Sequence, residues 1–442
     1  MSEHSPLTPL IIASLLQREG GTGHIYLAYS GGMDSHVLLH LCQSLPDVKG
    51  RLTAVHVHHG LQEAADAWPR HCRKIAGQLG VDFLELRVKA YPVGRESPEE
   101  AARNARYDAL KTLLGDDDVV LLAQHRDDQL ETVLLQLFRG AGLPGLSAMP
   151  EVMVLGKGRL LRPLLAVSRR AMEAYARGHG LRWVADPSNR SDEFDRNFLR
   201  NQVLPQLQQR WPALAKTVSR SARHCAEASA FIEQGAQKLL ARVWREEYQA
   251  LALTELRLLD RYRQQLVIRH WFKTLGLKMP SQAFVSRVLN ELVDATKKND
   301  PILYNQGFML RRYRDELFCV AQTAANFEPH TIDWPASVDA LLLPDRRKLQ
   351  CLPAMTGIDA TLWRTAKISV RFRKGGEKIK LPKREGRHAL KNLYQEAGIA
   401  PWLRPSIPLI YIDERLAAVA DLWIDADFYV ENNGGCIKLV WR

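Results

Sequence analysis

Residues 24–35 read HIYLAYSGGMDS, and an apolar helical run, HVLLHLCQSL, follows directly at residues 36–45. The first part is β-rich, so SGGMDS forms the turn between a predicted strand and a predicted helix. The glycine pair lets the backbone approach an anion closely, and the N–H groups at the start of the helix supply positive potential. The predicted phosphate loop comprises Ser30, Gly31, Gly32, Met33, Asp34 and Ser35.

This loop differs from the GxxxxGK[ST] phosphate loop because it has no lysine for the outer phosphates. We therefore expect it to hold a pyrophosphate unit. Asp34 would repel phosphate, so we expect it to hold Mg²⁺ or a cationic substrate. The alternative is an ordinary glycine-rich turn with a capping aspartate. The complete hexapeptide at a strand-to-helix junction favours the nucleotide site.

Short β-rich runs alternate with amphipathic helical runs from residue 24 to about 186, which is typical of a parallel sheet flanked by helices. The expected strands cover residues 24–30, 51–59, 81–88, 118–125, 159–165 and 181–186. After Pro205 the pattern becomes helical, and later prolines predict an irregular segment before a last group of strands. We expect an α/β protein with a Rossmann-like domain at 1–213, an α-rich domain at 214–325, a linker at 326–365 and a small basic α+β domain at 366–442.

The 442 residues carry a formal net charge of +12, and the pI is about 9.4. This balance predicts a polyanionic partner such as nucleic acid, although charge alone does not separate RNA from DNA or from an acidic membrane. No apolar run is long enough to cross a bilayer, so we expect no membrane partner. The six cysteines are scattered without a CxxC pair, so we expect reduced thiols in a cytoplasmic protein.

Histidines follow the second predicted strand in the run HVHHGL at residues 56–61. Three histidines could indicate a metal site, but no cysteine or carboxylate cluster with ligand spacing lies nearby. We therefore expect His56 to position the backbone or to contact a nucleotide.

The run HRDDQLET at residues 125–132 lies where a strand ends and a helix begins, which is where parallel-sheet enzymes bind ligands. Asp128 and Glu131 are three residues apart and share a helix face. They can grip an ammonium group together, or one can bind it while the other accepts a proton. Capping of the helix by acids is the alternative and would explain Asp127 alone.

Two pairs of arginines have helical spacing. Arg103 and Arg106 lie in the helix that begins at the capping sequence SPEE of residues 97–100, and Arg196 and Arg200 are four residues apart. Arginines on adjacent helical positions suit a phosphate-rich ligand. A solvated helix face is the alternative.

Together these stretches resemble a known family. SGGMDS looks like the loop of the N-type ATP pyrophosphatases, which cleave ATP between the α and β phosphates. Its combination with HVHHGL, AARNARY, HRDDQLET, GAGLPGL, DPSN and DRNFLR, all within residues 24–205, resembles the tRNA(Ile)-lysidine synthetases. The likeness continues more weakly to PWLR at residues 401–404.

The resemblance implies a ligase that attaches the ε-amine of free L-lysine to C2 of the wobble cytidine in tRNA(Ile) with a CAU anticodon. The C2 oxygen would first be adenylated by ATP, which releases diphosphate, and lysine would then displace AMP. Because an amine with a pKa of about 10.4 arrives protonated, Asp128 or Glu131 would accept its proton.

The resemblance also implies ATP and Mg²⁺ as cofactors, with Asp34 as the Mg²⁺ ligand. The expected catalytic residues are Asp34, Asp128, Glu131 and Arg106. The expected nucleotide contacts are the six loop residues Ser30 to Ser35, together with His56 and His125. In this domain the expected tRNA contacts are Arg103, Arg196 and Arg200.

Basic residues crowd one segment of the last domain and outnumber its acids, Glu377, Glu385 and Glu396. We expect phosphate contact there rather than a merely solvated surface. The basic residues are Arg364, Lys367, Arg371, Arg373, Lys374, Lys378, Lys380, Lys383, Arg384, Arg387, Lys391 and Arg404.

Three other functions stay open at this point. A tRNA thiolase of the same superfamily commonly needs paired cysteines, and an amidotransferase-type synthetase would need a glutaminase partner. A non-catalytic RNA-binding protein would have no use for SGGMDS beside carboxylates at strand ends. A homodimer rests on the resemblance alone, since the residues specify neither the oligomeric state, the tRNA identity elements, the order of substrate binding nor the general base.

Overall fold

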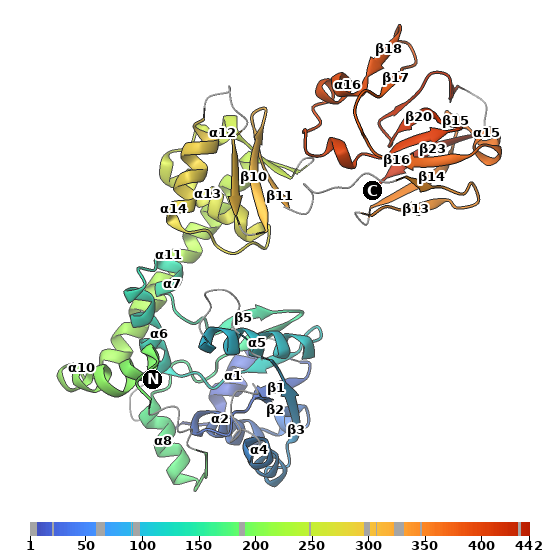
Figure 1. Ribbon diagram of the computed structural model, residues 1–442. Helices are drawn as coiled ribbons and strands as arrows, with labels where there is room; N and C mark the ends of the chain where they lie inside the picture. The colour runs from blue at the N-terminus through green and yellow to red at the C-terminus, as the bar shows by residue number, and fades with distance from the viewer. Residues whose placement is uncertain are drawn as a thin grey trace. The chain divides into compact units, whose positions relative to one another are not determined.

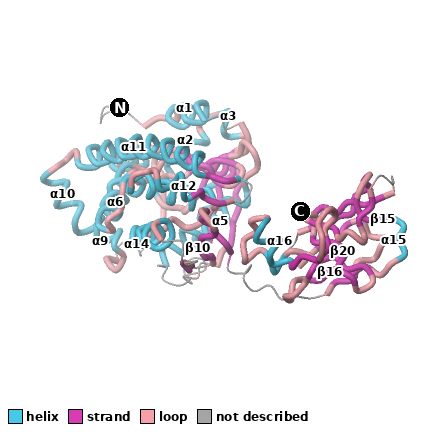
Figure 2. The backbone as a smooth tube through the Cα atoms, turned by 90° about the horizontal axis from the view of Figure 1, so that it is seen from above, coloured by secondary structure: helices cyan, strands magenta, loops and turns pink. Residues whose placement is uncertain are grey.

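A computed structural model describes residues 7–19, 22–58, 67–89, 91, 98–184, 191–246, 249–295, 301–305, 307–321, 331–344, 347–431 and 435–442. The chain divides into two compact units, Met1–Gln234 and Gly235–Arg442 (Figure 1). Helices and strands alternate along the first unit, whereas strands dominate the last part of the second (Figure 2). No helix of the described residues is long and apolar enough to span a membrane.

The first unit is built around a six-stranded sheet in the order β3-β2-β1-β4-β6-β5. The strands are β1 Ile25–Ala28, β2 Leu52–His58, β3 Asp82–Arg87, β4 Val119–Leu121, β5 Val152–Leu155 and β6 Gly158–Leu161. All pair in parallel except β5, which is antiparallel to β6. The chain builds outward from β1 to β3 and then returns to place β4 on the other side of β1. Ligands of such sheets bind at this switch point, beyond the carboxyl ends of β1 and β4.

Helices cover both faces of this sheet (Figure 1), because alternate side chains of a strand point to opposite faces. Val119 and Leu121 are buried in one core with residues of α2, whereas Val120 packs in a second core with Leu110 of α5. The helices are α1 Leu10–Glu19, α2 Met33–Gln43, α3 Pro46–Lys49, α4 Ala67–Gln78, α5 Pro98–Leu113, α6 Arg126–Phe138, α7 Leu143–Leu146, α8 Arg169–Gly178 and α9 Asp195–Phe198, followed by a π-helix Leu199–Val203, α10 Leu204–Arg210 and α11 Leu214–Val243.

The second unit starts with a five-stranded sheet, β7-β8-β11-β10-β9, whose core includes the fully buried Trp271 and Phe272. Its strands are β7 Trp244–Arg245, β8 Ala250–Ala252, β9 Ile302–Asn305, β10 Phe308–Tyr313 and β11 Glu316–Ala321. Its helices are α12 Leu253–Arg257, α13 Arg261–Thr274, α14 Gln282–Arg287 and a π-helix Val288–Val293.

The last part of the chain contains two more five-stranded sheets, β12-β16-β19-β20-β21 and β13-β14-β23-β15-β22, and the hairpin β17-β18. The strands are β12 Ile332–Asp333, β13 Ala340–Leu342, β14 Lys348–Ala354, β15 Gly357–Asp359, β16 Ile368–Arg371, β17 Lys378–Lys380, β18 Arg387–Ala389, β19 Leu409–Ile412, β20 Arg415–Val419, β21 Trp423–Ile424, β22 Tyr429–Val430 and β23 Cys436–Trp441. The helical segments are α15 Ala360–Thr365, α16 Leu390–Glu396 and the 3₁₀ turn Arg404–Ser406.

The predicted α/β class, with a parallel sheet followed by an α-rich part and a mixed C-terminal part, is confirmed. Two local expectations are wrong. Residues 181–184 lie outside the sheet, and Val184 N–H instead donates to the Gly31 carbonyl at 3.0 Å. The described residues 332–344 and 347–365 are not irregular, because β14 pairs along its length with β23. This pairing joins segments too far apart in sequence for the local pattern to indicate it. The domain boundaries at 213, 325 and 365 stay predictions.

Candidate active site

The predicted phosphate loop joins β1 to α2 at the switch point of the sheet. Gly31 has φ +81°, a conformation that side chains other than glycine rarely adopt. A Cβ atom at Gly31 would lie 2.9 Å from the Cys72 sulfur, so space and backbone angle both require glycine. Gly32 is the N-cap of α2 with an ordinary φ of −75°. The first N–H groups of α2 have no partner within the helix and are therefore available to an anion.

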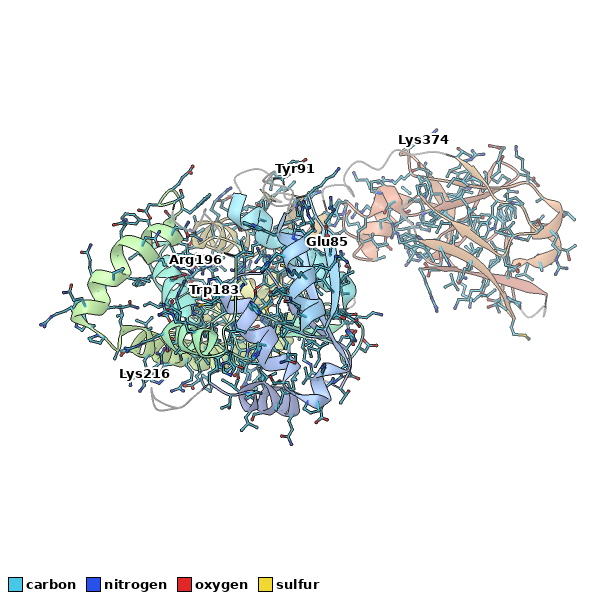
Figure 3. The ribbon with its side chains drawn as sticks, turned by 90° about the horizontal axis from the view of Figure 1, so that it is seen from below. Glu85, Tyr91, Trp183, Arg196, Lys216 and Lys374 are labelled. Carbon is cyan, nitrogen blue, oxygen red and sulfur yellow. The ribbon has the colours of Figure 1, made fainter. Side chains whose placement is uncertain are left out.

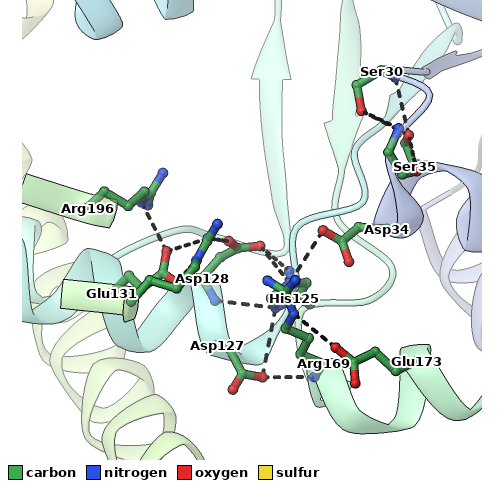
Figure 4. Close-up of polar contacts among 12 residues, drawn as sticks. Ser30, Asp34, Ser35, His125, Asp127, Asp128, Glu131, Arg169, Glu173 and Arg196 are labelled. Atoms are coloured by element: carbon green, nitrogen blue, oxygen red, sulfur yellow. Dashed lines mark hydrogen bonds and ion pairs between the residues drawn. The ribbon is translucent and has the colours of Figure 1, made fainter. Parts of the chain in front are cut away.

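Two serines hold the loop in shape (Figure 4). The Ser30 and Ser35 hydroxyls lie 3.1 Å apart, and Ser30 N–H donates to the Ser35 hydroxyl at 3.2 Å. The Ser35 hydroxyl donates to the Gly32 carbonyl at 3.1 Å, and Gly32 N–H donates to the Ser30 hydroxyl at 3.3 Å. These hydrogen bonds within the loop fix its shape, so that its backbone is held in place for a ligand.

His56 lies behind the loop. Its Nδ1 donates to the Tyr29 carbonyl at 2.9 Å, because a carbonyl can only accept, and the Cys72 sulfur lies 3.7 Å from the same nitrogen. Burial is the main reason why the pKa of His56 is lowered, with His58 and Arg106 as further causes, so the ring is neutral at pH 7. His56 therefore supports the residue that enters the loop. The rest of its motif, residues 59–61, lies outside the described residues.

His125 and Asp128 form the start of α6. His125 is the N-cap of this helix: Asp128 N–H donates to His125 Nδ1 at 3.4 Å, and His125 N–H donates to Asp128 Oδ2 at 2.9 Å. In the neutral ring Nδ1 accepts this bond, so the proton sits on Nε2. The protonated ring would give up this acceptor and would then carry a proton on Nδ1, 3.9 Å from Asp127 Oδ2. The capping alternative for this motif is therefore real for Asp128 as well.

The loop and the α6 cap meet at Asp34 (Figure 4). His125 Nε2 lies 3.7 Å from Asp34 Oδ2 and 3.5 Å from Asp128 Oδ2. Burial disfavours the charged form of Asp34, yet the His125 ring and the charges of Arg169 and Arg200 lower the pKa of this carboxyl. Burial likewise opposes the cation at His125, but Asp34, Asp128 and Asp127 outweigh it and raise the pKa of the imidazole.

Glu131 is held by two arginines. It is 1% exposed, and Arg200 binds it with both prongs, Nε to Oε1 at 2.6 Å and Nη2 to Oε2 at 2.8 Å. Arg196 Nε lies 3.2 Å from Glu131 Oε2. Arg200 Nη2 also donates to Asp128 Oδ1 at 3.3 Å. The structure thus pairs the predicted tRNA arginines with the predicted catalytic carboxylates, and Asp128 is the more exposed carboxylate of the two.

Three further contacts at this site were not expected from the sequence. Arg169 N–H, at the start of α8, donates to Asp127 Oδ2 at 2.9 Å, so Asp127 anchors a second helix. Thr132 accepts from Arg196 Nη2 at 2.8 Å, and Cys72 sets the space behind Gly31. The capping Ser168 signals the start of α8, but no local pattern links it to residue 127.

The arginines of α5 make other contacts than those of this cluster. The guanidinium of Arg103 lies 5.3 Å from the ring centroid of Tyr107. The charge of Arg106 is near enough to His56 to lower the pKa of His56, although burial is the larger cause. Both arginine residues are exposed. The motif DPSN at residues 186–189 lies outside the described residues.

Acids within the basic C-terminal segment and in later turns and loops offset much of its charge. Arg371 pairs with Glu414. The other ion pairs are Arg373–Glu377 at 3.7 Å, Lys380–Asp427 at 3.8 Å, Lys383–Glu431 at 3.7 Å and Arg384–Glu396 at 3.0 Å. Arg404 is buried and donates to the Ile399 carbonyl and the Tyr313 hydroxyl. Within the described chain, no ion pair involves the exposed side chains of Lys374 (Figure 3), Lys378 or Arg387.

The unliganded, metal-free protein should lose stability at both ends of the pH range because of the Asp34–His125 contact. The lowered pKa of Asp34 stabilises the fold above the ordinary value of 3.8, and this contribution disappears as pH falls through the folded-state pKa. The raised pKa of His125 stabilises the fold below 6.5, and this contribution disappears as pH rises through the folded-state pKa. Melting temperatures measured in chelator from about pH 2 to about pH 9 would show both declines.

Replacement of His125 with asparagine keeps a good N-cap acceptor while removing the titrating ring. The variant should lack the decline on the alkaline side. An equal alkaline decline in wild type and variant would contradict the assignment.

Models of three known domain families match the chain. Residues 11–207 match a PP-loop domain, residues 251–318 the TilS substrate binding domain and residues 368–441 the TilS substrate C-terminal domain. A protein of Methylococcus capsulatus is 41% identical over 407 residues, covering 91% of this chain and 92% of the relative. One of Legionella pneumophila strain Lens is 38% identical over 428 residues, covering 96% of each chain. Both relatives are named tRNA(Ile)-lysidine synthase.

Proposed function

The chain belongs to the tRNA(Ile)-lysidine synthase family, and on that basis we propose that it joins free L-lysine to C2 of the wobble cytidine of tRNA(Ile) with a CAU anticodon. As a member of this family it is an ATP-using ligase with a PP-loop domain. The family match over nearly the full length favours this activity over a thiolase or a non-catalytic RNA-binding protein. The observation that carries the proposal lies at the sheet's switch point. There His125 lies beside both Asp34 of the loop and Asp128 of α6, and Glu131 follows on the same helix.

The first step transfers AMP to the cytidine C2 oxygen and releases diphosphate. The loop around Gly31 and the first N–H groups of α2 hold the departing diphosphate, because unpaired backbone donors stabilise an anion without reorganisation. The exposed Arg106 and Arg103 of α5 contact the phosphates of the nucleotide or of the RNA.

The residues present fit one Mg²⁺ ion. Asp34 Oδ1 is buried and accepts no hydrogen bond within the described residues. The pKa of this carboxyl is nevertheless lowered, which favours the charged form that a metal ion needs. One carboxylate combined with substrate phosphates is a common Mg²⁺ environment. The ion, when bound, would neutralise charge that develops on the phosphates. No group of three or more metal-ligating side chains occurs in the described chain, so the phosphates and water would complete the coordination.

The second step requires a carboxylate that can receive a proton from the lysine ammonium. Both oxygens of Glu131 contact arginine, whereas Asp128 Oδ1 has only the longer 3.3 Å contact with Arg200. We therefore assign the ammonium contact and the proton to Asp128, and to Glu131 the task of holding Arg196 and Arg200. The nearby His125 can transfer a proton between Asp128 and Asp34.

The partners follow from this reaction. The C-terminal basic segment contacts the tRNA backbone, and a tRNA substrate places the protein in the cytoplasm. The six cysteines are free, as a reducing compartment requires. A homodimer remains part of the proposal on family grounds only.

AMP release tests the function directly. Purified protein is incubated with ATP labelled in the α-phosphate, tRNA(Ile) transcript with a CAU anticodon and lysine, and each substrate is withheld in turn. AMP should accumulate only with the tRNA and lysine together, and labelled lysine should enter the RNA. A transcript whose anticodon begins with guanosine is the matched control. Equal AMP formation without tRNA would contradict the proposal.

Neutralising the unpaired basic residues should weaken tRNA binding and flatten its salt dependence. The triple variant of Lys374, Lys378 and Arg387 to alanine removes three charges that no carboxylate offsets in the described chain. If all three contact phosphates, the slope of log K against log salt should fall by about 2 to 3.

Binding titrations at several salt concentrations measure this slope. Replacement of Lys49, Lys74 and Lys157, three exposed lysines of the first unit, removes the same charge and is the control. An identical slope in both triple variants would contradict a specific role for the C-terminal segment.

A further inference from the structure

Arg162 is a buried cation without an acidic partner. It directly follows β6 and is 1% exposed. Its Nε donates to Gln124 Oε1, its Nη1 to the Pro150 carbonyl at 2.7 Å and its Nη2 to the Tyr107 hydroxyl at 3.1 Å. These acceptors are uncharged, as is the Met153 sulfur, which lies 3.7 Å from Nη2. No carboxylate pairs with Arg162 in the described part of the chain.

Such an arginine is an unfavourable choice for packing alone. Burial without a counter-charge lowers the pKa of the guanidinium, and an apolar side chain of similar size would fill the same space without this penalty. What arginine offers is a planar fork whose donors point in several fixed directions at once. The structure uses these directions to join three segments that lie far apart in sequence.

Two of the joined segments lead to the candidate active site. Gln124 directly precedes His125, the N-cap of α6, so the Arg162 contact holds the point where this helix begins. Tyr107 lies in α5 directly after Arg106, one of the exposed arginines assigned to phosphates.

The third segment returns to the same helix. Pro150 follows Met149, and the side chain of Gln129 in α6 binds both backbone groups of Met149, at 2.9 and 2.7 Å. Arg162 therefore contacts α6 indirectly in two ways. It binds Gln124, the residue before the N-cap of α6, and it binds Pro150, whose neighbour Met149 is hydrogen-bonded to Gln129 of α6.

We propose that Arg162 is a positioning residue for the ligase reaction, which sets the start of α6 with Asp128 and Glu131 relative to the arginines of α5. It touches none of the residues assigned to the reacting groups and acts through Gln124, Tyr107 and Pro150. This inference rests on the proposed function. The loop on β1 and α2 lies outside this network, so its contact with the diphosphate of ATP should not depend on Arg162.

Arg162→Met tests the proposal because methionine fills space without a buried charge. kcat for lysine-dependent AMP release should fall about 10- to 100-fold, since a displacement of about 1 Å costs this much. The KM for ATP should change by a smaller factor than kcat, because the phosphate loop lies outside the network. The melting temperature should fall modestly, since the buried acceptors on Gln124, Pro150 and Tyr107 lose their donor. Arg162→Lys should not restore kcat, because a single ammonium cannot reach three acceptors.

The control is Arg159→Met, which removes an arginine from β6 itself and should leave kcat unchanged. Tyr107→Phe removes only the hydroxyl and should lower kcat by a smaller factor, with no additional loss when combined with Arg162→Met. Wild-type kcat in Arg162→Met, or in Tyr107→Phe should the first variant not fold, would overturn the inference. A wild-type protein without lysine-dependent AMP release would instead refute the function on which it rests.

Discussion

Asp128→Asn should abolish lysine incorporation, with a loss of about 10²- to 10⁴-fold, while tRNA affinity stays within about twofold. Asparagine can still accept from His125 N–H, so the cap of α6 should survive. It cannot carry the charge that holds the lysine ammonium, nor accept its proton. Incorporation of radiolabelled lysine and filter binding of tRNA measure the two effects separately.

Asp116→Asn is the matched control, because this exposed carboxylate lies in the turn before β4, at the opposite end of the strand from the site. It should retain wild-type incorporation. Normal incorporation in Asp128→Asn would refute the assignment of Asp128. Glu131→Gln should also lose incorporation, but for a different reason. Its neutral amide would leave Arg196 and Arg200 without the carboxylate that pairs with them.

Gly31→Ala should lower ATP consumption by about two orders of magnitude or more, because the loop can no longer keep the shape that presents its amides. The residue has φ +81°, and the new Cβ would lie 2.9 Å from the Cys72 sulfur. A left-handed backbone at a non-glycine residue costs about 1–2 kcal/mol before any clash is counted. AMP release and ATP binding by calorimetry measure the loss.

Gly32→Ala provides the comparison within the same loop. Its Cβ would lie 3.4 Å from the Ser30 hydroxyl, and its φ of −75° suits any residue, so the loss should be much smaller. Adding Cys72→Ala to Gly31→Ala removes the sulfur but not the backbone strain, so it should restore activity only in part. Equal activity of the two glycine variants would contradict the geometry of the loop.

Motifs that depend on neighbouring residues were well predicted. The SGGMDS turn, the strands leading to it and the helix starting at residue 126 follow from glycine conformation, strand alternation and capping, all of which act within a few residues. The expectation of an irregular segment before residue 366 failed for its described residues, because β14 pairs with β23 near the C-terminus. The acids that offset Lys380 and Lys383 likewise lie on a later segment.

By itself the sequence determined the parallel sheet, the phosphate loop at its centre and the family, because these depend on local backbone preferences and on short motifs. Only the tertiary structure decided which carboxylate is available to a substrate. Glu131 and Arg200 are 69 residues apart, and no periodicity couples them. Their pairing, like the three-way contact of Arg162, exists because the switch point of the sheet brings β4, β6 and the segments after them into one place, where buried charges and donors must find partners.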